Sequence, residues 1–217
     1  AIGLMAGVCG RAYNVSGTGL NQYILLLANT GTGKESVAEG IDKIINAASM
    51  RIPVAFEFIG PSRIASGQAL SIVGEFGKRL EIMSSKNATS SEKNLLIELL
   101  DLYHKSGHGR VAKPSIYSDQ DKNTLAINSP AFSLLGESTP ETFYNSLTEE
   151  MITDGLLPRF MLIEYNGKRP SLNENHTNVF PSEEFSNKIV NLMNHAKTIT
   201  HNRNVVNVRY SDDAYRL

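Results

Sequence analysis

Continuous apolar runs alternate along this chain with stretches that are apolar on one helical face only. The run "YILLLA" at 23–28 has no polar interruption, which is typical of a strand buried on both faces of a parallel sheet. Shorter apolar runs predict further strands, with Pro53 tolerable only at the start of its strand. These strands are predicted at 53–59, 71–73, 124–127, 132–135, 160–165 and 205–210.

Apolar residues at helical spacing predict four helices between these strands. The first covers 37–48, after a glycine-rich loop, and the second covers 95–103 and ends before Gly107. The third begins at Thr139 and Pro140, a good N-cap and first-turn pair, and continues to Gly155 as a single helix. The fourth is capped by Ser182 and runs through Met193.

This alternation predicts an α/β fold with a mainly parallel sheet flanked by helices. Neither repeats nor an interdomain linker is visible, so residues 1–217 are interpreted as a single domain. Residues 1–20 form an N-terminal edge segment, and 171–217 add a helix and a strand of open role. The segment "ASGQALSIVGEFG" at 65–77 leaves few residues to connect the two central strands, which suggests that a stretch of a parent protein is missing.

The composition of the chain bears on nucleic-acid binding, disulfide formation, zinc binding and membrane insertion. A formal net charge of −1 over 217 residues gives no global basic field, so any nucleic-acid binding must come from local patches or an assembled ring. The lone Cys9 excludes an internal disulfide, and no thiol cluster indicates zinc. No apolar stretch is long enough for a membrane helix, and the short apolar start is interpreted as a domain edge. A cytoplasmic location is therefore predicted.

The most specific candidate for a functional motif is the loop after the first strand, "NTGTGKES" at 29–36. Gly31 and Gly33 can adopt backbone angles that point N–H groups inward around a phosphate, and Lys34 would reach the β- and γ-phosphates. Glu35 stands where a hydroxyl normally binds Mg²⁺, although a carboxylate can also hold this ion. The alternative is a plain glycine-rich turn. The predicted nucleotide-binding residues are Asn29, Thr30, Gly31, Thr32, Gly33, Lys34, Glu35 and Ser36.

An ATPase also needs an acid at the end of a neighbouring strand. The segment "SIVGEFG" supplies Glu75, with Gly74 where a second acid is usual. Glu75 is the predicted water-activating base, and Glu35 and Glu75 are the predicted Mg²⁺ ligands. An exposed glutamate at a turn is the alternative for Glu75, and Glu57 is a weaker second candidate for the base.

Two further positions fit roles in phosphate chemistry. Ser138 and Glu137 lie at a strand tip, where a polar residue can contact the γ-phosphate or the attacking water, whereas Thr139 is better explained as an N-cap. Arg159 lies just before a strand and could complete a neighbouring subunit's active site. A salt bridge at a strand edge is the alternative for Arg159. Lys168 and Arg169 are interpreted as solvated turn residues.

The most basic window is "HKSGHGRVAK" at 104–113. It could follow a nucleic-acid backbone, with an aromatic residue for stacking, although a solvated loop is the commoner explanation. Its histidines have no third metal ligand at regular spacing, so no zinc site is predicted. The residues in question are His104, Lys105, His108, Arg110 and Lys113, with Tyr103 and Tyr117 nearby.

Seven segments in order resemble a family of P-loop ATPases of bacteriophages and integrated elements, whose members are labelled helicases or primase-associated helicases. The resemblance covers about residues 6–170. It implies a RecA- or AAA+-like core that assembles as a ring, with ATP bound between subunits through Lys34, Glu75 and Arg159, and with DNA, most simply single-stranded, as the track. The segments are "AGVCGRAYNV", "LLANTGTGKES", "ASGQAL", "GEFGKRL", "KPSIYSD", "LLGESTPETFY" and "DGLLPRFMLIEYNGKRP".

The leading hypothesis is therefore an ATP- and Mg²⁺-dependent DNA motor of phage or mobile-element replication. The alternative is a DNA-binding or assembly module whose loop holds nucleotide without hydrolysing it, which Glu35 and Gly74 favour. A small-molecule kinase would need a basic lid and an acceptor pocket, and a GTPase would need a guanine-reading motif. The sequence shows no basic lid, no acceptor pocket and no guanine-reading motif.

Overall fold

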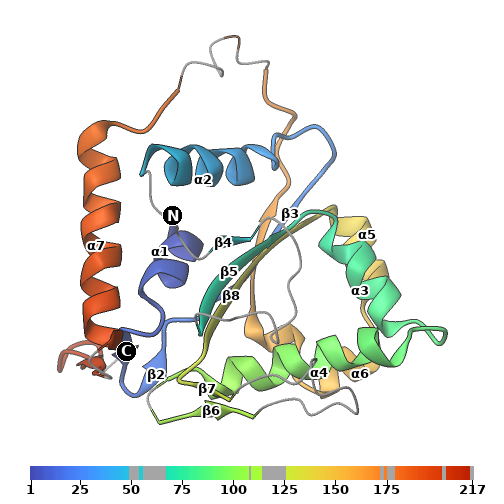
Figure 1. Ribbon diagram of the computed structural model, residues 1–217. Coiled ribbons are helices and arrows are strands. Elements are labelled where there is room, and N and C mark those ends of the chain that lie inside the picture. The colour runs from blue at the N-terminus through green and yellow to red at the C-terminus, as the bar shows by residue number, and fades with distance from the viewer. Residues whose placement is uncertain are drawn as a thin grey trace.

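A five-stranded parallel sheet forms the centre of the molecule (Figure 1). The computed structural model describes residues 1–48, 54–55, 67–107, 109–113, 126–171, 174, 179–201 and 204–215. The strand order is β4-β5-β8-β3-β9, and every neighbouring pair is parallel. The strands are β3 (Tyr23–Ala28), β4 (Val54–Ala55), β5 (Gln68–Val73), β8 (Ala131–Ser138) and β9 (Phe160–Tyr165). The predicted α/β class is confirmed.

Burial differs sharply between the middle and the edge of this sheet. All eight residues of β8 are buried, including the polar ones, because β3 and β5 flank it and helices cover both of its faces. β9 lies at the edge, and five of its six residues are exposed. The predicted strands at 23–28 and 160–165 match β3 and β9 at both ends.

Helices cover the two faces of the sheet in two layers (Figure 1). On one face lie α1 (Ile2–Cys9), α2 (Ser36–Ala47) and α7 (Glu183–His201), which share an apolar cluster with Leu70 and Leu135. On the other face lie α3 (Phe76–Ser84), α4 (Ser90–Lys105), α5 (Pro140–Ser146) and α6 (Glu149–Thr153). Their cluster contains Leu25 and Phe132, so neighbouring residues of each strand point to opposite layers.

Local hydrogen bonds explain where the helices begin. The Thr139 hydroxyl accepts a bond from the Thr142 backbone N–H at 3.3 Å, which confirms its predicted N-cap role. Ser182 caps α7 through a 3.2 Å bond from the Phe185 N–H, as predicted. The start of α4 is a complete capping box between Thr89 and Glu92.

The prediction of a single helix over 139–155 is wrong, because the chain breaks between α5 and α6. Leu147 has an extended backbone with ψ 134°, and the Thr148 hydroxyl caps a new helix by accepting from the Met151 N–H. The helices α1 and α3 were not predicted. Of the predicted strand at 53–59, the structure describes only β4, and of that at 124–127 only its end, within β7 (Ile127–Asn128).

Smaller elements complete the chain. β1 (Tyr13–Val15) pairs with β2 (Thr18–Gly19) and with β10 (Val206–Val208), so the predicted last strand joins this small sheet and not the central one. β6 (Val111–Ala112) pairs with β7, and a short 3₁₀ turn, η3 (Leu157–Arg159), precedes β9. In the part of the chain that the structure describes, no helix is both long and apolar enough to span a bilayer.

Candidate functional site

The carboxyl ends of β3, β5, β8 and β9 meet at one edge of the sheet. After β3 the chain enters α2 on one face, whereas after β5 and β8 it enters α3 and α5 on the other face. In open parallel sheets, ligands bind outside the carboxyl ends where the connections diverge to opposite faces. The loop at 29–35 leaves β3 at this point, so the fold puts the predicted phosphate loop where a ligand crevice is expected.

The loop has the backbone geometry that a phosphate cradle requires. Gly31 has φ +77° and Gly33 has φ +84°, conformations that other residues rarely adopt. The Ser36 N–H donates to the Gly33 carbonyl at 3.1 Å, which turns the chain into the first turn of α2. The Thr32 hydroxyl donates to the Asn29 carbonyl at 2.8 Å and holds the loop closed on itself. The remaining predicted residue, Thr30, is exposed on the loop.

Lys34 lies across the inside of this loop. Its Nζ donates to the Ala28 carbonyl at 2.6 Å and to the Asn29 carbonyl at 3.4 Å. The ammonium group therefore lies over the end of β3 and not out in solvent. Because uncharged carbonyls are its hydrogen-bond acceptors, its charge remains available to an anion bound in the loop.

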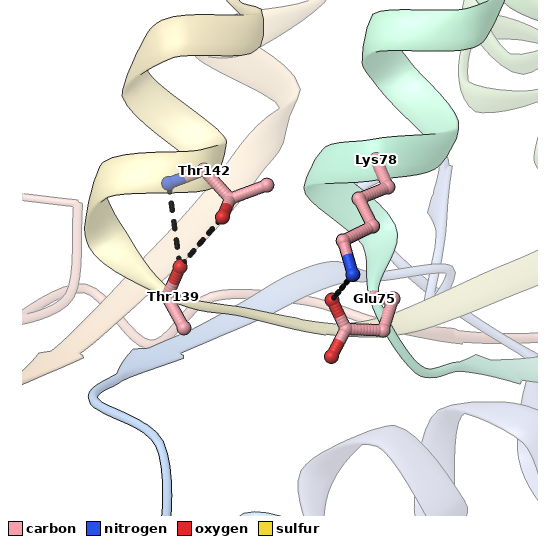
Figure 2. A network of polar contacts seen from close by, with 4 residues as sticks. All are labelled: Glu75, Lys78, Thr139 and Thr142. Carbon is pink, nitrogen blue, oxygen red and sulfur yellow. Dashed lines mark hydrogen bonds and ion pairs between the residues drawn. The ribbon is translucent and has the colours of Figure 1, made fainter.

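Glu75 follows β5 and precedes α3, in a conformation that is uncommon for a glutamate. Its φ of +52° and ψ of +38° are left-handed, and such strained residues cluster at functional sites. Its Oε2 lies 3.3 Å from the Lys78 Nζ, and 68% of its side chain is exposed (Figure 2). A Cβ added at the neighbouring Gly74 would meet no atom within 4 Å, so a larger side chain would fit there.

Glu137 is the site residue that sequence reasoning underrated. It is only 7% exposed at the carboxyl end of β8, and its Oε1 has no hydrogen-bond partner. Burial raises the pKa of its carboxyl group, the nearby Glu35 carboxylate raises it further, and Lys34 lowers it. These influences indicate that Glu137 faces the phosphate loop. The sequence feature that could have identified Glu137 is a single glutamate within an otherwise uncharged run of buried residues.

Ser138 lies on the opposite face of β8 from Glu137. It is 2% exposed, its Oγ has no hydrogen-bond partner, and a Cβ added at Gly77 of α3 would lie 2.5 Å from that oxygen. Ser138 therefore faces α3 and the start of α5. Figure 2 shows the two helix starts, with Thr139 before α5 and Glu75 before α3. The role predicted for Ser138 stays a prediction.

Arg159 is not brought to the phosphate loop of its own chain. It precedes β9, whose first residue, Phe160, pairs with Tyr23 at the start of β3, so Arg159 lies at the opposite edge of the sheet from the loop. Its guanidinium contacts the Gly155 carbonyl and the His104 ring, and its Cζ lies 5.8 Å from the centre of the Tyr103 ring. The contact predicted between Arg159 and a nucleotide is therefore not formed within one chain.

Arg169 does lie at the loop. A Cβ added at Gly31 would be 3.2 Å from both the Nε and the Cζ of Arg169, which follows β9 on the strand beside β3. A guanidinium against a loop of N–H donors is expected where an anion binds between them. Arg169 is exposed, in agreement with its interpretation as a solvated turn residue, but its contact with Gly31 was not predicted, because nothing in "NGKRP" reveals that β9 pairs with β3.

The residues present fit a magnesium ion bound together with a nucleotide. Mg²⁺ is usually held by one or two carboxylates with substrate phosphates and water, and Glu35 and Glu137 provide two carboxylates beside the loop. Among the described residues, no group of three or more His, Cys, Asp and Glu side chains could hold a metal alone. The site therefore suits a metal that arrives with a phosphate ligand.

The basic window lies at the amino end of the sheet, away from the phosphate loop. Lys105 forms an ion pair with Asp101 on α4, and Arg110 lines a cleft of about 580 Å³. Arg11 and His201 also line this cleft, which gives it a basic wall. His108, Tyr117 and Glu57 lie outside the described residues.

No protein-family model matches this sequence, and no curated protein matches it either.

Proposed function

We propose that this protein binds and hydrolyses ATP at the carboxyl edge of its parallel sheet and couples the reaction to movement on DNA. The observation that carries the proposal is the loop of Gly31, Gly33 and Lys34 at the end of the buried strand β3, where the chain connections diverge. The strand order supports the RecA- or AAA+-like core that the sequence resemblance implies. Numbered along the chain, the order is 5-1-4-3-2, with β8 between the loop strand β3 and the acid-bearing strand β5.

Each charged group at this edge has a role in the proposed reaction. The loop N–H groups, the N-terminus of α2 and Lys34 hold the β- and γ-phosphates. Arg169 binds the phosphates from the other rim of the loop. Glu75 accepts a proton from water as the water oxygen attacks the γ-phosphorus and the bond to the ADP oxygen breaks. Mg²⁺, when bound, neutralises charge on the phosphate oxygens.

The DNA and ring parts of the proposal have separate support. The position of Arg159 at the far edge of the sheet supports a ring, because an arginine there can reach only the nucleotide of a neighbouring subunit. The cleft lined by Arg11, Arg110 and His201 supports a track for a phosphate backbone. The choice of DNA as the polymer rests on the sequence resemblance alone.

DNA-stimulated phosphate release tests this function. Lys34→Ala, Glu75→Gln and Arg159→Ala are each expected to lower turnover, with removal of a general base typically costing about 10²- to 10⁴-fold. Glu81→Gln serves as a matched control for Glu75→Gln, because Glu81 is an exposed residue of the same helix, α3. If all three site variants keep wild-type turnover, the assigned roles are wrong.

A second candidate is a module that binds nucleotide for assembly without hydrolysing it. The observation in its favour is the state of Glu75, which is mostly exposed and paired with Lys78 instead of aimed at the loop. Tight nucleotide binding with no measurable phosphate release, with or without DNA, would favour this module over the motor.

A further inference from the structure

Glu137 is a buried carboxylate whose burial nothing in its own surroundings explains. It is 7% exposed, and its Oε1 has no hydrogen-bond partner among the residues that the structure describes. An unpaired buried charge is costly, and unsatisfied groups of this kind in native proteins need a specific reason such as an ion. Lys34 lowers the pKa of Glu137 through space, but it forms no hydrogen bond with this carboxylate, since its Nζ donates to the Ala28 and Asn29 carbonyls.

The direction of the Glu137 side chain follows from the alternation of β8. Leu135, two residues earlier, belongs to the apolar cluster of α1, α2 and α7, whereas Leu134 belongs to the cluster on the opposite face. Glu137 therefore points to the layer that contains α2 and the phosphate loop. Glu35 is the residue at the start of α2, in the same layer.

The register of the sheet also relates Glu137 to Gly74, the position where an ATPase usually has a second acid. Val73, the last residue of β5, pairs with Gly136 of β8, and continuing this register by one step would put Gly74 beside Glu137. By the same alternation both positions face the α2 layer, because Ile72 lies in the cluster of that layer. Glu137 thus presents a carboxylate to the same face, on the strand next to β3.

We propose that Glu137, together with Glu35, holds the Mg²⁺ that accompanies a nucleoside triphosphate in this loop, in place of an acid at position 74. A divalent cation neutralises two carboxylates that otherwise repel each other, one of them buried. The proposal deepens the nucleotide-binding function and rests on it. It differs from the sequence expectation, in which Glu75 was the second metal ligand.

Calorimetry of ATP binding, with Mg²⁺ or with EDTA, tests the proposal on the intact chain. Wild-type protein is expected to bind ATP at least tenfold more tightly with Mg²⁺, and Glu137→Gln is expected to lose this gain. Glu164→Gln is the matched control, because Glu164 lies near the end of β9, on the far side of β3 from β8, and accepts a 2.8 Å bond from the Tyr144 hydroxyl that glutamine can also accept. This control variant should keep the Mg²⁺-dependent increase in ATP affinity.

Two further measurements keep the test decisive. Without ligand, Glu137→Gln is expected to unfold at a higher temperature than wild type, because it removes a buried unpaired charge. The double variant Gly74→Asp with Glu137→Gln is expected to recover the Mg²⁺-dependent gain in affinity, since a Cβ at position 74 meets no described atom within 4 Å.

The outcomes separate this inference from the function on which it rests. If Glu137→Gln keeps the full Mg²⁺-dependent gain, or unfolds at a lower temperature than wild type, the metal role of Glu137 is refuted while nucleotide binding stands. If wild-type protein binds no ATP under either condition, the proposed function itself fails.

Discussion

Replacing Gly77 by alanine tests the close packing between α3 and α5, which sets the positions of the two helix starts beside the site. A Cβ at this position would lie 2.5 Å from the Ser138 Oγ, 3.1 Å from the Phe143 nitrogen and 3.1 Å from the Thr142 carbonyl carbon. The serine hydroxyl could rotate away, but the two backbone atoms cannot move unless α5 shifts. The substitution therefore overpacks a helix crossing.

The expected cost follows from two opposing effects. Overpacking a well-packed site costs about 1–3 kcal/mol, and the better helix propensity of alanine returns up to about 1 kcal/mol. A net loss of roughly 1–2 kcal/mol in the free energy of unfolding should lower the melting temperature of a chain of this size by about 2–4 °C per kcal/mol. Urea denaturation and thermal unfolding both measure this loss.

Gly74→Ala is the matched control, because a Cβ at Gly74 meets no atom within 4 Å and the backbone there is not left-handed. It should change stability by no more than about 0.5–1 kcal/mol, in the stabilising direction. If Gly77→Ala proves as stable as wild type or more stable, the tight crossing of α3 and α5 does not exist as described.

Four other changes have clear expectations. Thr89→Ala should cost about 1 kcal/mol in urea denaturation, because it removes the side-chain cap of α4. Hydrogen bonds from the backbone and then the side chain of Thr89 lower the pKa of Glu92, so the advantage of wild type over Glu92→Gln should be fully present above the ordinary value of 4.5 and fade as the pH falls below it. Tyr23→Phe should cost about 1 kcal/mol, because the buried Tyr23 hydroxyl donates to the Leu99 carbonyl at 2.8 Å. Arg169→Ala should weaken ATP binding about tenfold in calorimetry, the loss of one charge-assisted hydrogen bond, without changing the melting temperature.

Each of these expectations has its own refutation. A pH-independent difference between wild type and Glu92→Gln would contradict the capping box. A Tyr23→Phe variant of wild-type stability would mean that the hydroxyl contributes nothing in its buried position. Unchanged ATP affinity in Arg169→Ala would show that Arg169 does not contribute to ATP binding.

The central strands could be predicted from the sequence because burial on both faces leaves an unbroken apolar run. The bounds of β3 and β9 agree with the prediction, and the glycine loop between β3 and α2 has the expected left-handed residues. The break between α5 and α6 could not be predicted, since Leu147 and Met151 continue the apolar spacing across it and both pack into the same cluster. Only the cap at Thr148 marks the break.

Side-chain direction and strand pairing account for what the sequence left open at the site. Glu137 and Ser138 are adjacent at one strand tip, and only the burial of Leu135 and Leu134 in opposite layers shows which of them faces the loop. Arg169 reaches Gly31 only because β9 lies beside β3, a pairing between segments more than a hundred residues apart. Such long-range pairing leaves no trace in a local pattern.

The most direct measurement is the heat of ATP binding to the intact protein in the presence of Mg²⁺, for wild type and for Lys34→Ala. The geometry of the loop predicts a saturable heat for wild type and a loss of affinity of at least tenfold in the variant, because one ammonium group and the loop N–H groups hold the triphosphate. Absence of binding by wild-type protein, or equal affinity in Lys34→Ala, would contradict the assignment of this loop as a nucleotide site.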